Sequence, residues 1–158
     1  MKSTQQFNAA VGYYQLGMYE EAWQELKGLP AGEELRTEVL GLKISVLMQL
    51  KHWEQAVSQS TELLKISPGE KAAYIDIAYC LHELGRTEQA REFLLGAVNL
   101  LRDNATFHYN MACYEARLGN LESARGYLQH ACKMDGHFKE FSKTDPDLKP
   151  LRKKKGKS

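Results

Sequence analysis

Residues 84–90 read Leu84-Gly85-Arg86-Thr87-Glu88-Gln89-Ala90, and the leucine and alanine of this stretch recur along the chain every 34 residues. The residue after each leucine is glycine in three places and Lys51 in the fourth. Self-similarity at a fixed period of this kind is typical of repeat architectures. The sequence therefore predicts four copies of one structural unit. The two columns are Leu16, Leu50, Leu84 and Leu118, and Ala22, Ala56, Ala90 and Ala124.

Each repeat has the pattern of two helices joined by a tight turn, as the third repeat illustrates. Between Ala73 and Leu84, apolar residues recur at steps of three and four, which is the stripe of an amphipathic helix. Gly85 is expected to end that helix, because glycine adopts the left-handed conformation of a C-terminal cap without strain. A second stripe runs from Ala90 to Leu101. Neither helix buries its stripe alone, so neighbouring pairs must stack as in a solenoid.

The composition excludes several other classes of protein. The 158 residues are 43% hydrophobic and 26% charged, which argues against a disordered chain or a collagen. No apolar run approaches the roughly 20 residues of a membrane-spanning helix, and the N-terminus lacks the apolar segment of a secretory signal. Cys80, Cys113 and Cys132 are too scattered for a disulfide framework. A cytoplasmic location is therefore expected.

The repeat resembles the tetratricopeptide repeat (TPR) family, in which 34-residue helix-turn-helix units stack. The second repeat carries the family's Trp-x-x-Ala step as Trp53-Glu54-Gln55-Ala56 and its terminal proline as Pro68. The resemblance implies an all-α, right-handed α-solenoid with a C-terminal capping helix. We expect one domain over residues 1–151 and a basic, disordered tail at 152–158. The expected parts of the domain are repeats at about 3–36, 37–70, 71–104 and 105–136, and a cap at 137–151.

Three positions depart from the family pattern: Lys51 replaces a glycine, Ser60 a large apolar residue, and Glu115 an apolar residue. After Gly136 the phase of the repeat is lost. Residues 137–142 then read as a short capping helix with Phe138 and Phe141 on one side. Residues 145–147 start a turn, and the leucines that follow, Leu148 and Leu151, are expected to fold back onto the last helix pair.

The first helices of stacked repeats line a concave surface, and their outward side chains form the candidate peptide-binding groove. Its aromatic, thioether and directional polar groups suit a peptide or helix with apolar anchors. Tyr79 and Tyr109, on neighbouring first helices, are expected to flank one anchor side chain, and Arg117 to orient the peptide. The candidate groove residues are Phe7, Val11, Tyr14, Ser45, Met48, Gln49, Ile75, Asp76, Tyr79, His82, Glu83, Tyr109, Asn110, Cys113 and Arg117.

One TPR subclass grips the C-terminal carboxylate of chaperones with a clamp of Lys, Asn, Asn, Lys and Arg. Neither possible frame of this sequence supplies the cationic donors that a carboxylate needs, so that ligand is not expected. The clamp positions hold Phe7, Val11, Leu42, Ala72 and Asp76 in one frame, and Gly41, Ser45, Asp76, Thr106 and Asn110 in the frame one repeat later.

No catalytic, cofactor or metal site is predicted. Cys80 and His82 are two residues apart, which places them about 200° apart around a helix, and His130 and Cys132 fail as a metal pair for the same reason. Cys80 falls in an apolar column and is expected to be a buried structural residue. The sequence contains no phosphate loop, dinucleotide fingerprint or Ser-His-Asp arrangement.

The predicted function is that of a non-enzymatic adaptor or scaffold that binds a partner protein or peptide in its concave groove. The alternative is a small TPR chaperone that shields apolar segments of a client, as in type III secretion. The charge is asymmetric: residues 1–151 hold 16 basic and 20 acidic residues, a net charge of −4, whereas residues 152–158 hold five basic residues. An acidic body does not favour nucleic acid as a partner. Self-association through the solenoid ends stays open.

Overall fold

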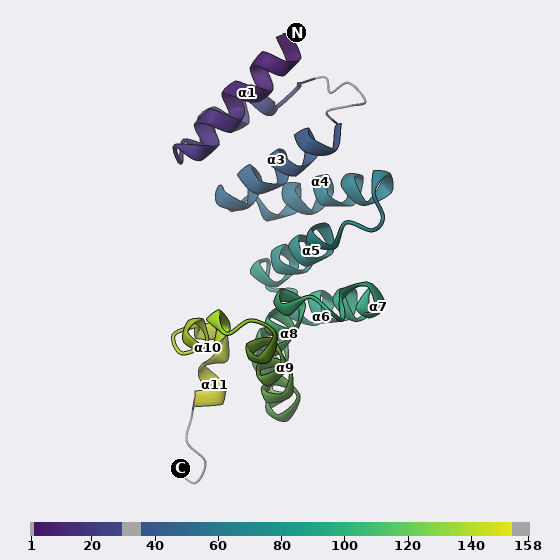
Figure 1. Cartoon of the computed structure of the whole chain (residues 1–158), viewed down its shortest axis with the longest axis vertical. Helices are drawn as coiled ribbons and strands as arrows, with labels where there is room; N and C mark the ends of the chain where they lie inside the picture. The colour runs from purple at the N-terminus through teal and green to yellow at the C-terminus, as the bar shows by residue number, and fades with distance from the viewer. Residues whose placement is uncertain (1, 30–35, 153–158) are drawn as a thin grey trace. The chain divides into compact units, whose positions relative to one another are not determined.

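A computed structural model describes residues 2–29 and 36–152, and the folded elements in these ranges are α-helices and one 3₁₀ turn (Figure 1). The all-α prediction is confirmed, since no strand occurs in either range. Within them, no helix is long and apolar enough to cross a membrane. The elements are α1 (Lys2–Gln15), α2 (Tyr19–Leu26), α3 (Arg36–Gln49), α4 (Trp53–Ile66), α5 (Lys71–Glu83), α6 (Thr87–Leu95), α7 (Val98–Leu101), α8 (Ala105–Arg117), α9 (Leu121–Met134), α10 (His137–Phe141), η2 (Pro146–Leu148) and α11 (Lys149–Arg152).

The same turn ends the first helix of every repeat. Residues 17, 51, 85 and 119 all have positive φ, at 75°, 60°, 80° and 87°. The next residue donates its backbone N–H to the carbonyl five positions back, at 2.8–2.9 Å in all four repeats. The residue with positive φ donates to the carbonyl three positions back. These two bonds are those of a Schellman motif, which satisfies carbonyls at a helix C-terminus.

The chain divides into two compact units, residues 1–80 and 81–158, and the boundary lies inside α5. The predicted single domain over 1–151 therefore stays a prediction. Arg152, which the sequence placed in the tail, is the last residue of α11. The rest of the tail, 153–158, and the predicted end of the first repeat at residues 30–35 lie outside the described residues.

In the first unit, the helix pairs α1–α2 and α3–α4 pack through small and branched side chains. Ala10 and Ala22 are completely buried in one cluster with Leu26 and Val46. Leu47, Ala56 and Cys80 form another cluster, so Cys80 is a buried apolar contact. The alanines allow the paired helices to approach closely. Ser60 is also fully buried, and its hydroxyl has no hydrogen-bond partner among the described residues.

In the second unit, α8 is the central helix, packed against α6 and α9. Phe107, Met111 and Tyr114 on α8 are almost entirely buried. The second helix of the third repeat differs from the prediction, because it is broken into α6 and α7 after Gly96. Glycine is a poor helix former, and a break there still leaves Leu101 buried in the core.

Glu115, the acid at an expected apolar position, is only 8% exposed and is fully paired. Its carboxylate accepts hydrogen bonds from Arg91 of α6 at 3.3 Å, Asn120 at 2.9 Å and Ser123 of α9 at 3.0 Å. Burial alone would raise the pKa of Glu115, but the hydrogen bonds from Asn120, Ser123 and Arg91 outweigh it and hold the pKa below its usual value. Glu115 thus joins three helices by a polar contact in place of an apolar one.

The Schellman turns predict that Lys51→Gly stabilises the protein by about 0.5–1 kcal/mol. A non-glycine residue at φ 60° bears a steric penalty that glycine escapes, although glycine also loses more backbone entropy on folding. The free energy of unfolding from urea titrations followed by circular dichroism measures the change. Gly85→Ala is the reciprocal control and should lower it by about 1 kcal/mol. A destabilising Lys51→Gly would contradict this account of the turn.

Candidate functional site

In the first unit, the predicted groove residues lie along the first helices and are partly open to solvent. Gln49 and Tyr79 are exposed, and Tyr79 retains 39% of its accessible surface. The Tyr79 ring also packs edge-on against Trp53, with centroids 5.8 Å apart. The predicted residues of this unit that are half-buried are Phe7, Val11, Tyr14, Ser45, Met48, Ile75 and Asp76.

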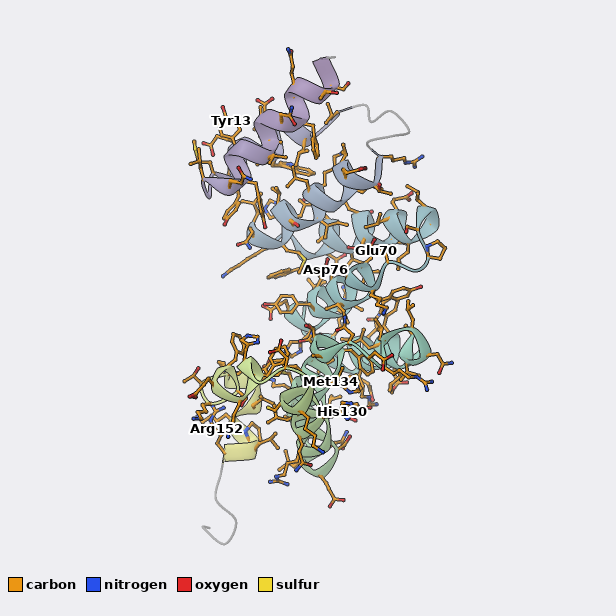
Figure 2. The ribbon with its side chains drawn as sticks, viewed as in Figure 1. Tyr13, Glu70, Asp76, His130, Met134 and Arg152 are labelled. Carbon is orange, nitrogen blue, oxygen red and sulfur yellow. The ribbon has the colours of Figure 1, made fainter. Side chains whose placement is uncertain are left out.

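Two of these predicted residues, Ser45 and Asp76, share a pocket of about 310 Å³ between α3 and α5. Small residues on both helices leave this space open. The pocket's charged lining side chains are Asp76 and Glu70, both acidic, and Figure 2 labels both of them. The full lining is Thr37, Gly41, Ile44, Ser45, Leu63, Glu70, Ala72, Ala73 and Asp76.

Asp76 is unusual in this pocket because its carboxyl group is half-buried, and no described residue gives it a hydrogen bond or an ion pair. Burial raises the pKa of its carboxyl group to about 6, because the charged form loses hydration without gaining a partner. The folded protein therefore bears an electrostatic penalty at this position at neutral pH.

In the second unit, the corresponding face of α8 is covered by residues 137–152, which we call the C-terminal clasp. Tyr109 is only 5% exposed, because its ring stacks on Phe138 with centroids 4.5 Å apart and an interplanar angle of 14°. Phe141 meets the same ring edge-on at 5.6 Å. Leu148 is buried, as the sequence predicted for a segment that folds back.

Two aspartates of the clasp bind polar side chains of the predicted groove. The Tyr109 hydroxyl donates to Oδ2 of Asp145 over 2.6 Å. Nε2 of His82 lies 2.9 Å from Oδ2 of Asp147, and Nε of Arg117 lies 3.7 Å from its Oδ1. The other His82 nitrogen, Nδ1, contacts the Thr87 hydroxyl at 2.8 Å. A neutral ring with its proton on Nε2 satisfies both of these contacts.

The last residue of the clasp, Arg152, stabilises the conformation of the clasp by hydrogen bonds to its backbone. Arg152 donates from one guanidinium nitrogen to the carbonyl oxygens of Ser142 at 3.0 Å and of Asp145 at 2.9 Å. Oδ1 of Asp145 accepts the backbone N–H of Asp147 at 3.0 Å, which fixes the η2 turn. The side chains that reach the groove are therefore pre-positioned by a locally bonded loop.

Cys113 also lies under the clasp, with its Sγ 3.8 Å from Oδ2 of Asp145. Burial, together with the charges of Asp145 and Asp147, raises the pKa of the thiol far above its usual value. The protonated thiol is the form expected at neutral pH, which does not favour a nucleophilic role. Ligand atoms of Cys113, Asp145 and Asp147 lie within 4.8 Å of one another, but both carboxylates already accept bonds from protein donors.

The structure thus brings the predicted groove residues together in two different settings. Ser45 and Asp76 line an open pocket, whereas His82, Tyr109, Cys113 and Arg117 meet under the clasp. Glu83 is exposed and Asn110 is half-buried. Sequence reasoning missed Asp145 and Asp147, which it assigned only to a turn. The available signal was two acids in a segment expected to fold back onto a helix that carries Tyr109 and Arg117.

Comparisons with known proteins agree with the helical-repeat fold. Two family models described as tetratricopeptide repeat match residues 47–112 and 105–138. MamA 41-end from Desulfovibrio magneticus RS-1 is 21% identical, with a TM-score of 0.76 over 89% of this chain and 80% of that one. TTC0263 of Thermus thermophilus, a thermophilic TPR protein, is 19% identical, with a TM-score of 0.69 over 85% and 75%.

A third solved structure, YrrB, is described as a TPR protein with an unusual peptide-binding site. It is 19% identical, with a TM-score of 0.73 over 90% of this chain and 75% of that one. Identities this low establish a shared fold and nothing further about ligands. No curated protein matches the sequence.

The raised pKa of Asp76 predicts a stability difference that depends on pH. Between about pH 4 and pH 6 the folded state binds more protons at this group than the unfolded state, so its contribution to stability falls as pH rises. Asp76→Asn should therefore raise the free energy of unfolding at pH 7 by about 1–3 kcal/mol. The gain should vanish at pH values below about 3, where both states of the wild type are protonated.

Urea titrations of both proteins across this pH range provide the measurement. Glu122→Gln, at an exposed position of α9, is the matched control for the loss of one carboxylate. A gain at pH 7 that persists unchanged in acid would show that the effect of Asp76→Asn is not electrostatic.

The contacts of the clasp predict that Asp145→Ala destabilises the second unit by about 1–3 kcal/mol. The substitution leaves the buried Tyr109 hydroxyl without its acceptor and removes the bond that fixes η2. It should also expose Cys113, so alkylation by iodoacetamide, mapped by mass spectrometry, should become faster at that residue. Asp103→Ala, at an exposed position before α8, is the control. Unchanged stability together with unchanged alkylation of Cys113 would refute the clasp.

Proposed function

Because the chain belongs to the tetratricopeptide repeat family, we propose that it is a non-enzymatic adaptor that holds a segment of a partner protein against the first helices of its repeats. The TPR fold is a protein-interaction fold, and a site must still be argued from the residues that form it. The observation that carries the proposal is the open pocket between α3 and α5 in the first unit.

The first unit has the composition of a working interface. Tyr79 offers a partly exposed aromatic ring that is braced by Trp53, and Met48 offers a flexible thioether on α3. Aromatic residues and methionine are enriched at protein interfaces, and tyrosine is one of the residue types that dominate their binding energy. The pocket beside them gives a partner side chain a place to enter.

The second unit also supports the proposal, because a segment of the chain lies against the first helix of its last repeat. The clasp sets two aromatic rings and two carboxylates against the face of α8, as a bound peptide would. That face is occupied in the closed chain, so the proposal assigns the partner to the first unit. The peptide-binding site of YrrB lends support to a peptide as ligand, at the level of a shared fold.

We place the protein in the cytoplasm, because the three scattered cysteines Cys80, Cys113 and Cys132 do not form a disulfide framework and are in keeping with a reducing compartment. The partner is a protein or peptide, and nucleic acid is not proposed, because the body of the chain is acidic.

The experiment is selection of binding peptides from a random library displayed on phage, with the purified full chain as bait. Selected peptides are then titrated by fluorescence anisotropy. Tyr79→Ala should weaken their binding by about 2 kcal/mol, or roughly 30-fold, while the helical circular dichroism signal is retained. Gln89→Ala, at an exposed position of α6, should change binding little.

Two outcomes would count against the proposal. The first is that no peptide is enriched on the immobilised protein relative to a support that carries no protein. The second is that the selected peptides bind equally well to Tyr79→Ala and to Gly41→Leu, a variant that fills the pocket, which would move the site elsewhere.

A further inference from the structure

The pocket between α3 and α5 is open because the residues that line it where the two helices face one another have small side chains. Gly41 on α3 has no side chain, and a Cβ built there would meet no atom within 4 Å. Ser45 lies one turn further along α3, and Ala72 and Ala73 stand at the start of α5. With a volume of about 310 Å³, the pocket is at the lower end for ligand sites and suits one long side chain.

The lining of the pocket is acidic and contains no basic residue that could pair with its carboxyl groups. Asp76 and Glu70 contribute two carboxyl groups, and no lysine, arginine or histidine is among the lining residues. Thr37 and Ser45 add hydroxyl groups, of which the Thr37 hydroxyl already donates to Glu38 at 2.9 Å. Asp76 has no hydrogen bond or ion pair with any described residue. A half-buried carboxylate without a partner is destabilising, so a complementary ligand would remove a penalty as well as form a bond.

Glu115 provides a comparison within the same chain. It is also a carboxylate on the first helix of a repeat, but it is surrounded by the guanidinium of Arg91 and two further donors. The pKa of Glu115 is lowered, whereas that of Asp76 is raised to about 6. The two acids therefore differ in their partners: Glu115 accepts three hydrogen bonds, whereas Asp76 accepts none from the described residues and lines an open pocket.

We propose that this pocket receives a lysine or arginine side chain of the partner segment, with Asp76 as its ion-pair acceptor. The apolar stem of such a side chain lies against Ile44 and Ala73, and its charged head reaches Asp76, with Glu70 as a second negative charge at the pocket. Charge-assisted hydrogen bonds of this type are among the stronger polar contacts, especially where solvent is partly excluded. The inference rests on the proposed function and names the chemistry of the partner: a basic residue next to apolar anchors.

The direct test uses butylguanidinium as a mimic of an arginine side chain and butylurea as its neutral isostere. Each is titrated into the full chain labelled with ¹⁵N, and the backbone amide shifts are followed. We expect butylguanidinium to bind about tenfold more tightly than butylurea, with the largest shifts at Gly41, Ser45 and Asp76. The pKa of Asp76, read from its ¹³C carboxyl resonance, should fall when butylguanidinium is bound.

Two variants separate charge from space. Asp76→Asn retains the shape of the pocket and should abolish the preference for butylguanidinium over butylurea. Gly41→Leu retains the carboxylate and should weaken both probes, because its side chain enters the pocket from a helical position without backbone strain. Glu122→Gln, which removes one exposed carboxylate from α9, should change neither titration. Equal binding of the two probes by the wild type, or an unchanged preference in Asp76→Asn, would overturn the inference.

The peptides selected for the proposed function distinguish the two ideas. Peptides that carry a basic residue at a fixed position, and that bind Asp76→Asn about tenfold more weakly, support both. Peptides that lose affinity in Tyr79→Ala but not in Asp76→Asn, and that show no basic preference, leave the proposed function standing and overturn the inference. A pocket that binds butylguanidinium in a chain that selects no peptide supports the cation site and overturns the proposed function.

Discussion

The left-handed turn that ends each first helix is the constraint on which the rest of the structure depends. Its two hydrogen bonds recur at the same positions of all four repeats, and they hold the following helix at the same place in each copy. Because the phase is constant, the small residues of successive repeats, such as Ala22 and Ala56, return to helix contacts and are buried. The turn keeps the same conformation at Lys51, where a lysine adopts a positive φ in place of glycine.

A constant phase also directs the same positions of the first helices outward, yet the two units use them differently. In the first unit these positions border a pocket with a carboxylate that lacks a partner. In the second unit they are covered by a segment of the chain itself, which supplies stacking rings to Tyr109 and carboxylates to His82 and Arg117. The clasp therefore covers this face with aromatic rings next to carboxylates, one of which faces the guanidinium of Arg117.

Glu115, which is buried, and Asp76, which is half-buried, show how different the surroundings of a carboxylate on a first helix are in the two units. Glu115 satisfies both its oxygens within the fold and joins α6, α8 and α9. Asp76 satisfies neither among the described residues and faces open space. A buried polar group that is paired contributes to a unique packing, whereas a carboxylate that loses hydration without gaining a partner bears a desolvation cost.

The sequence by itself predicted the 34-residue period, the turn that ends each first helix, and a capping helix at residues 137–142, which is α10 (His137–Phe141) in the structure. These features follow from local rules: an apolar stripe fixes a helix face, and a glycine or a tolerated substitute fixes a left-handed cap. Only the tertiary structure decided the partners of Glu115, the burial of Tyr109 and Cys113, and the roles of Asp145 and Asp147. The physical reason is that these contacts join residues far apart in the sequence. Arg91 meets Glu115 across 24 residues, Tyr109 meets Asp145 across 36 and His82 meets Asp147 across 65, so each contact exists only after the helices have packed.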